Sequence, residues 1–183
     1  SYRAVAVPIL TGFTAENLEK LVTHSDSVIL FTEQKTWESL DVEQMPNLKA
    51  AICIENFSCP WSRNNVLKEV APNIQQLFRD KYPQGMKRTL IHYELGEPDD
   101  LNTISYTSGT TSSPKGIMLS NKNISSNITF GINRIKIPRD SRIVSMLPLA
   151  HLYGLAFEFI FPICSGATVY FLGKTPSPSL LMQ

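Results

Sequence analysis

The sequence predicts an α/β fold in which a mainly parallel sheet is flanked by helices. Its short apolar runs are continuous more often than alternating, which is typical of strands covered on both faces. Stretches with helical periodicity lie between several of these runs. The 183 residues, 43% of them hydrophobic, are enough to bury a core. The predicted strands are Ala4–Ile9, Ser27–Thr32, Lys49–Glu55, Thr103–Thr107, Arg142–Leu149 and Ala167–Leu172.

Three further stretches space their apolar residues as a helix does. Thr14 and Ser120 each precede such a stretch, and their hydroxyl groups can cap a helix N-terminus. A third period runs through residues 66–78, where Pro72 must kink the helix or split it in two. The residues expected to be buried are Leu18, Leu21 and Val22 in the first helix and Ile124, Ile128, Ile132 and Ile135 in the second.

Charge and cysteine content exclude several classes of protein. Lys and Arg number 17 against 16 Asp and Glu, so no overall field favours nucleic acid or an anionic membrane surface. Three cysteines without C-x-x-C spacing favour reduced, partly buried thiols of a cytoplasmic protein. No apolar run reaches the length of a membrane span.

Both ends of the sequence are expected to be cut. The chain lacks an initial Met and enters its first predicted strand at Ala4. Near the other end, Ser177-Pro178-Ser179 is a favourable helix start, but only four residues follow it. We therefore expect residues 1–183 to be a fragment of a longer protein.

The segment Tyr106–Gly116 is the strongest candidate for a binding site. Six hydroxyl side chains lie between Thr107 and Ser113, and Lys115 follows. Hydroxyls and exposed backbone N–H groups bind phosphate oxygens, and open α/β sheets bind ligands where strands end. A solvated Ser/Thr/Gly linker is the alternative, although the flanking apolar runs argue against it. A Walker A loop is excluded, because Lys115 precedes Gly116 instead of following a glycine.

This segment resembles the signature loop of the adenylate-forming superfamily, which includes acyl-CoA synthetases, luciferases and peptide-synthetase adenylation domains. Leu147–Gly154 resembles a second family block, and Ala4–Ile9 with Thr14-Ala15-Glu16 resembles the opening blocks. Ser112 stands where the family has glycine, and Asn121 where it commonly has histidine. The motif Pro148-Leu149-Ala150-His151 and the run Gly166–Phe171 are most similar to the long-chain fatty acid ligases.

The resemblance implies a fragment of the large N-terminal AMP-binding domain, without the C-terminal domain. It implies ATP, Mg²⁺ and CoA as cofactors or co-substrates and a carboxylic acid, favouring a fatty acid, as substrate. Lys115 and His151 would be catalytic, and Thr107 would be a magnesium ligand. His151 would pack where the acyl group meets the nucleotide; the alternative is a strand-end histidine satisfied by the backbone. The implied nucleotide-binding residues are Thr107, Ser108, Gly109, Thr110, Thr111, Ser112, Lys115 and Gly116.

The same resemblance places other parts of the active site beyond Gln183. These are the adenine-binding block, the magnesium-binding glutamate, the ribose-binding aspartate and the lysine of the C-terminal domain. We therefore expect the 183 residues alone to be inactive. Two alternatives stay open: a non-catalytic phosphate-binding or nucleotide-binding module, and an aryl-acid or amino-acid adenylating domain. Oligomeric state and peripheral attachment of the parent to a membrane also stay open.

Overall fold

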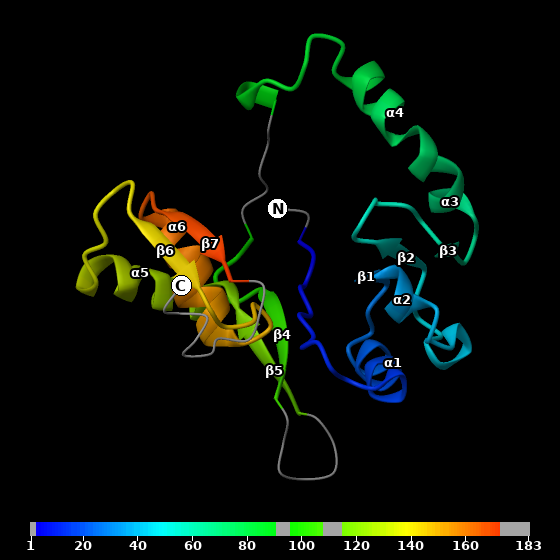
Figure 1. Ribbon diagram of the computed structural model, residues 1–183, viewed down its shortest axis with the longest axis horizontal. Coiled ribbons are helices and arrows are strands. Elements are labelled where there is room, and N and C mark those ends of the chain that lie inside the picture. The colour runs from blue at the N-terminus through cyan, green and yellow to red at the C-terminus, as the bar shows by residue number, and fades with distance from the viewer. Residues whose placement is uncertain (1–2, 91–95, 108–114, 173–183) are drawn as a thin grey trace. The chain divides into compact units, whose positions relative to one another are not determined.

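The computed structural model describes residues 3–90, 96–107 and 115–172. The chain forms two compact units (Figure 1). One unit combines Ser1–Thr11 with Glu94–Gln183, and the other is Gly12–Tyr93. Helices and strands occur in both, and the α/β class is confirmed. In the described part of the chain, no helix is both long enough and apolar enough to cross a membrane.

The unit Gly12–Tyr93 begins with helix α1 (Ala15–His24). The Thr14 hydroxyl accepts a hydrogen bond from the backbone N–H of Asn17 at 3.4 Å, so Thr14 is the predicted N-cap. Leu21 and Val22 are buried as expected, and Leu18 is half-buried.

A three-stranded sheet follows in the same unit. Strand β1 (Ile29–Thr32) pairs in parallel with β2 (Ala50–Cys53), and β3 (Trp61–Ser62) pairs with β2 in antiparallel orientation. The short helix α2 (Gln34–Trp37) and the 3₁₀ turn η1 (Val42–Gln44) connect β1 to β2. The core of this unit lies under β2 and the turn before it, where the buried residues include Met45, Leu48, Ala50, Ala51, Cys53 and Cys59.

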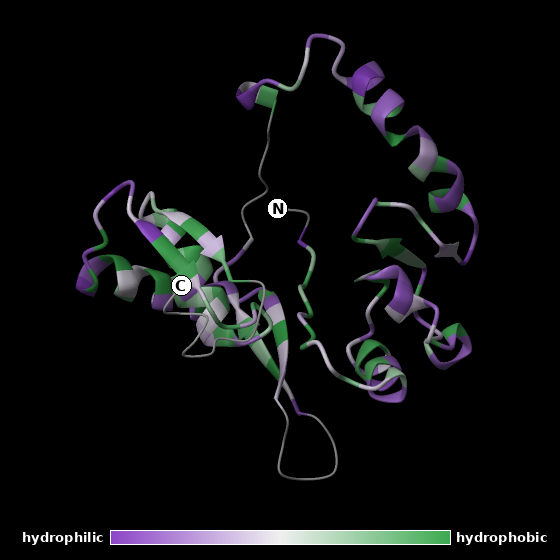
Figure 2. Ribbon diagram, viewed as in Figure 1, coloured by the Kyte–Doolittle hydropathy of each residue, from purple (hydrophilic) through white to green (hydrophobic). Residues whose placement is uncertain are grey.

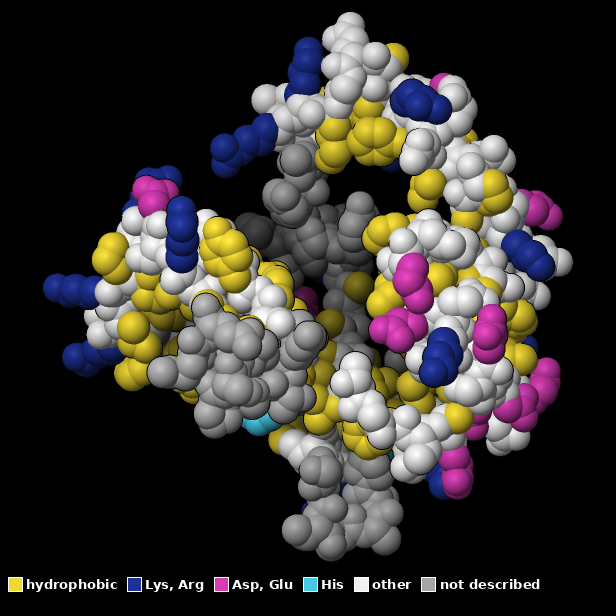
Figure 3. Space-filling view, in the orientation of Figure 1, with side chains coloured by type: hydrophobic (Ala, Val, Ile, Leu, Met, Phe, Trp, Pro, Cys, Tyr) yellow, Lys and Arg dark blue, Asp and Glu magenta, His cyan; other side chains and the backbone are white. Residues whose placement is uncertain are grey.

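The helical period of residues 66–78 is interrupted at Pro72, as predicted. Helix α3 (Val66–Val70) ends before it, the 3₁₀ turn η2 (Ala71–Asn73) contains it, and α4 (Ile74–Lys81) follows. A last 3₁₀ turn, η3, is Arg88–Leu90. The apolar residues of α3 and α4 are not buried; exposed hydrophobic side chains are yellow in Figure 3, and those of these two helices are Val66, Ile74, Leu77 and Phe78.

The other unit contains an antiparallel hairpin of β4 (Leu101–Thr107) and β5 (Lys115–Ser120). Ala6 forms one parallel bridge with Thr103. The Ala6 N–H donates to the Asn102 carbonyl at 2.9 Å, and the Ala6 carbonyl accepts from the Ile104 N–H at 2.9 Å. The predicted strand Ala4–Ile9 is thus reduced to a single bridge. The next ladder bond would need an N–H at Pro8, which proline lacks.

Helix α5 (Asn121–Arg134) begins directly after β5. Ser120 caps it as predicted, in a reciprocal capping box with Asn123. Ile128 is buried, but the prediction that Ile132 and Ile135 are buried is wrong, since they are 48% and 46% exposed. The buried stripe passes from Ile128 to Gly131, three residues on, and the helix ends before Ile135.

The last elements form a parallel crossover. Strand β6 (Arg142–Ser145) pairs with β7 (Thr168–Phe171), and the connection contains the π-helix η4 (Gly154–Ile160) and the helix α6 (Phe161–Cys164). This connection is largely hydrophobic (Figure 2). Strand β6 stops four residues before the predicted end at Leu149, because the N–H groups of Met146 and Leu147 bond to a side chain of η4 instead of a strand.

We predict that Gly131→Ala destabilises the protein. A Cβ atom at Gly131 would lie 2.9 Å from Cδ2 of Phe161, whose ring is only 2% exposed and cannot swing into solvent. Alanine normally stabilises a helix relative to glycine. We expect the free energy of unfolding to fall by about 1–3 kcal/mol instead, and overpacking against Phe161 would explain that loss. Chemical denaturation measures it. Ser126→Ala, at an exposed position of α5, is the control, and the companion change Phe161→Leu should restore part of the loss. Unchanged or increased stability of Gly131→Ala would show that the contact is loose.

Candidate functional site

The β4–β5 hairpin holds the two ends of the predicted phosphate loop together. Thr107, the last residue of β4, is paired directly with Lys115, the first residue of β5. Both side chains are exposed. The predicted nucleotide-binding residues between them, Ser108, Gly109, Thr110, Thr111 and Ser112, lie outside the described residues. The ladder therefore brings together the two ends of this segment, one carrying a hydroxyl and the other an ammonium group.

Gly116 is the position at which the hairpin needs a glycine. It pairs with Tyr106, which is 5% exposed. A Cβ atom at Gly116 would lie 3.1 Å from Cγ2 of Ile104 and 3.2 Å from the Tyr106 ring. Such contacts are tighter than ordinary van der Waals packing, so a side chain here would push against two residues of β4. Gly116, which ends the predicted loop, is therefore required by the packing of β5 against β4.

Asn121 fastens the base of the hairpin. Its side-chain amide donates to the Glu97 carbonyl oxygen at 2.8 Å, and its carbonyl oxygen accepts from the Asn102 amide at 2.8 Å. Asn102 lies where the register between β4 and β5 shifts by one residue. The residue at the family's usual histidine position thus ties the chain before β4 to the start of α5. The sequence alone gave no signal for this contact.

His151 lies in the turn between β6 and the π-helix. Its backbone N–H donates to the Pro148 carbonyl at 2.9 Å, and its carbonyl accepts from the Leu155 N–H at 3.0 Å. Its ring Nδ1 accepts from the Tyr153 N–H at 3.4 Å, and no partner for Nε2 occurs in the described part of the chain. The backbone therefore satisfies one ring nitrogen, and the ring is exposed.

Glu158 holds the end of β6, and sequence reasoning missed it. One carboxylate oxygen, Oε2, accepts from the N–H groups of Met146 and Leu147 at 2.8 Å each and from the Ser145 hydroxyl at 3.1 Å. A signal for it exists in the sequence, because Glu158 is the single charged residue between Arg142 and Lys174. Charged groups in such an apolar stretch need specific partners.

Gly154, the first residue of the π-helix, brings that helix against the His151 turn. A Cβ atom at Gly154 would lie 2.9 Å from the Pro148 carbonyl oxygen and 3.1 Å from Cβ of Leu147. Because the first of these is a backbone atom, the turn could not yield by a side-chain rotation. The glycine of the second predicted family block is therefore required by close approach of two backbones.

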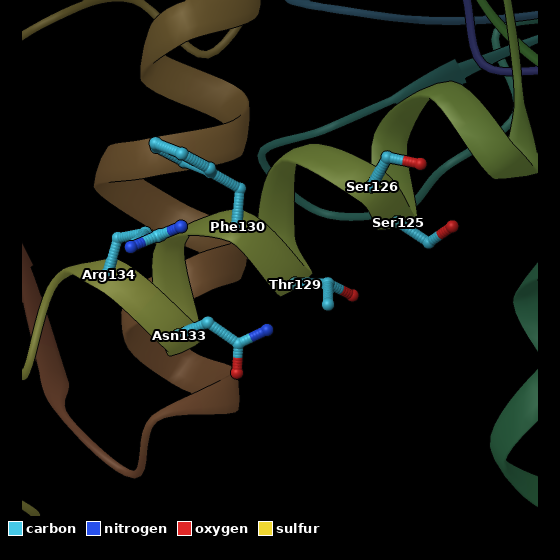
Figure 4. Close-up of a pocket in the computed structure, with 6 residues that line it drawn as sticks. All are labelled: Ser125, Ser126, Thr129, Phe130, Asn133 and Arg134. Carbon is cyan, nitrogen blue, oxygen red and sulfur yellow. The ribbon is translucent and has the colours of Figure 1, made fainter.

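A pocket of about 450 Å³ lies away from these groups, along one side of α5. All of its side chains come from that single helix (Figure 4). The lining residues are Ser125, Ser126, Thr129, Phe130, Asn133 and Arg134. It contains none of the predicted catalytic residues. In the ranges that the structure describes, no group of three or more His, Cys, Asp or Glu side chains could hold a metal ion.

The burial of the cysteines agrees with the prediction for Cys53 and Cys59 but not for Cys164. All three are free thiols, with Cys53 and Cys59 buried and Cys164 exposed. Burial raises the pKa of the Cys59 thiol, which lowers its thiolate fraction at neutral pH. This thiol is therefore a weak nucleophile.

Comparison with known proteins places these features in a family. The model of the AMP-binding enzyme family matches residues 1–183. The chain is 31% identical, over 194 aligned residues, to long-chain-fatty-acid–CoA ligase 4 of Saccharomyces cerevisiae, and the match covers 94% of this chain and 28% of the yeast protein. The chain thus spans little more than a quarter of that relative.

Solved structures show the same fold. The N-terminal domain of FACL13 from Mycobacterium tuberculosis, crystallised with an inhibitor, matches with a TM-score of 0.69 at 22% identity, over 97% of this chain and 41% of that one. The anthranilate CoA ligase AuaEII, in complex with anthranoyl-AMP, also gives 0.69 at 22% identity, over 93% of this chain and 31% of that one. As the segment Tyr106–Gly116 predicted, the chain belongs to the AMP-binding enzyme family.

Proposed function

We propose that this chain is part of the large N-terminal domain of an ATP-dependent fatty acid:CoA ligase. In the first step a carboxylate oxygen attacks the α-phosphorus of ATP, the bond to the β-phosphate oxygen breaks, and pyrophosphate leaves. In the second step the CoA sulfur attacks the acyl carbonyl, the bond to AMP breaks, and the thiol proton is lost to solvent. The family and the long-chain ligase among its relatives support this proposal.

The observation that carries the proposal is the pairing of Thr107 with Lys115. This pairing keeps a hydroxyl and a cation together at the ends of a segment rich in Ser, Thr and Gly. The departing pyrophosphate carries several negative charges, and hydroxyls, backbone N–H groups and one lysine can bind it. Ser108, Thr110 and Thr111 are proposed to contact the β and γ phosphates together with Lys115. Gly109, Ser112 and Gly116 are proposed to shape the loop around them.

Thr107 fits a magnesium ion bound mainly by the nucleotide. Mg²⁺ usually keeps several waters and takes one or two protein oxygens besides substrate phosphates. The Thr107 hydroxyl is one such oxygen, exposed beside the predicted phosphate site. When bound, the ion would neutralise charge on the phosphate oxygens. Thr107 would hold it next to Lys115.

His151 is proposed to act on the acid. Because Nδ1 accepts from the Tyr153 N–H, a ring proton is carried on Nε2. An exposed Nε2–H can donate to a carboxylate oxygen and orient it for attack. The strand–turn–π-helix geometry around His151 supports this role, because it fixes the backbone on both sides of the residue.

Free thiols support a cytoplasmic location for the protein.

We predict that Lys115→Ala in the full-length protein lowers kcat. Negative charge grows on the bridging oxygen as pyrophosphate leaves, so the lysine gains interaction energy along the reaction. Removing one such group typically costs 10-fold to 1,000-fold in rate, or about 1.4–4 kcal/mol. Steady-state kinetics with saturating acid and ATP measure the loss. Lys136→Ala, an exposed lysine with no proposed role, is the control. Unchanged kcat for Lys115→Ala would favour a module that binds phosphate without chemistry.

We predict that His151→Ala raises KM for the fatty acid and leaves KM for ATP nearly unchanged. A contact that serves one substrate affects the KM of that substrate alone. Varying each substrate separately, with the other held at saturation, gives the two constants. Equal increases in both would contradict the assignment of His151 to the acid.

A further inference from the structure

We infer that Glu158 is a positioning residue for His151, acting through the backbone that joins β6 to the π-helix. The inference rests on the proposed function, in which His151 contacts the acid. Glu158 contacts neither substrate in that proposal. Its carboxylate instead binds the backbone segment that precedes His151.

The contacts of Glu158 converge on a single oxygen. Its Oε2 accepts from the Met146 and Leu147 N–H groups at 2.8 Å and from the Ser145 hydroxyl at 3.1 Å. Three donors around one charged oxygen leave it little freedom to move, and hydrogen bonds to charged groups are the stronger kind. The carboxylate thereby holds the residues that follow the last paired position of β6.

The charge of Glu158 needs these donors. The side chain is half-buried and comes from an apolar helix, and within the described ranges it forms no ion pair with Lys or Arg. Hydrogen bonds to the carboxylate offset the loss of hydration in such surroundings. A sequence without a functional demand here could place an apolar residue at this position instead. The glutamate instead binds the two N–H groups that follow β6.

Two further contacts link the backbone held by Glu158 to His151. Pro148 follows Leu147 directly, and its carbonyl accepts the His151 N–H at 2.9 Å. The same carbonyl lies so close to Gly154 that a Cβ there would be 2.9 Å away, so the π-helix limits it from the other side. Beyond the turn, the His151 carbonyl accepts from Leu155 N–H at 3.0 Å. The turn is attached to the π-helix before and after the histidine.

The element that carries Glu158 is itself unusual. The helix Gly154–Ile160 has π geometry over seven residues. π-Helical turns are rare and occur frequently at functional sites. The π-helix supplies both Glu158 and Leu155, which hold opposite ends of the His151 turn.

The test compares Glu158→Ala and Glu158→Gln in the full-length protein. Glu158→Ala removes the acceptor and should raise KM for the fatty acid about 10-fold, equivalent to about 1.4 kcal/mol, with KM for ATP unchanged. Glu158→Gln keeps a neutral acceptor oxygen and should recover part of the loss. In a His151→Ala background, Glu158→Ala should add nothing, because residues that act as a unit are not additive. Glu69→Ala, the same change in an exposed part of α3, is the control.

A second measurement is independent of activity. Hydrogen exchange of the Met146 and Leu147 amides should be at least 10-fold faster in Glu158→Ala, while exchange in β4 stays unchanged. The inference would be overturned by unchanged exchange at these amides or by equal KM changes for both substrates. It would also be overturned if the two substitutions together raised KM for the fatty acid by the product of their separate increases. If Glu158→Ala does not fold, Ser145→Ala removes one donor of three and should give a smaller KM increase in the same direction. A full-length protein that consumes no ATP with any fatty acid would overturn the proposed function, and the exchange rates would still decide on the Glu158 contacts.

Discussion

The pairing of Thr107 with Lys115 is the constraint on which the candidate site depends. In the proposed site, a loop that binds phosphate loses less conformational entropy on binding when its two ends are already held. The antiparallel ladder holds them, and the bulge at Asn102 with the Asn121 contacts fastens the other end of the hairpin. Backbone pairing and the Asn121 contacts thus hold both ends of the hairpin.

Helix α5 connects the hairpin to the crossover that carries His151. Ser120 is both the last residue of β5 and the N-cap of α5, so the helix starts where the hairpin ends. Gly131, near its other end, lies against the buried ring of Phe161, the first residue of α6. The π-helix, which holds the His151 turn, immediately precedes that ring. Within this unit, the phosphate side and the acid side of the proposed reaction therefore share one helix as their common support.

The sequence predicted the elements whose signals are local, but not β5, the π-helix or α6. Caps at Thr14 and Ser120 and the break at Pro72 depend on neighbouring residues, and each was found where expected. The strand at Ala4–Ile9 and the end of β6 were less predictable, because a missing N–H at Pro8 and a distant carboxylate decide them. The buried face of α5 depended on a glycine, which a search for apolar spacing passes over. Thr107, Lys115 and His151 could be selected by resemblance. Glu158 stands out in the sequence as a lone charge in an apolar stretch, but its partners required tertiary contacts.

The most direct test of this account is exchange of labelled pyrophosphate into ATP by the full-length protein. Reversible adenylation of a bound acid requires that the site hold pyrophosphate, nucleotide and carboxylate together, which a binding module cannot do. The account predicts exchange that depends on added long-chain fatty acid and on Mg²⁺. ATP binding without exchange, across a panel of fatty, aryl and amino acids, would contradict it.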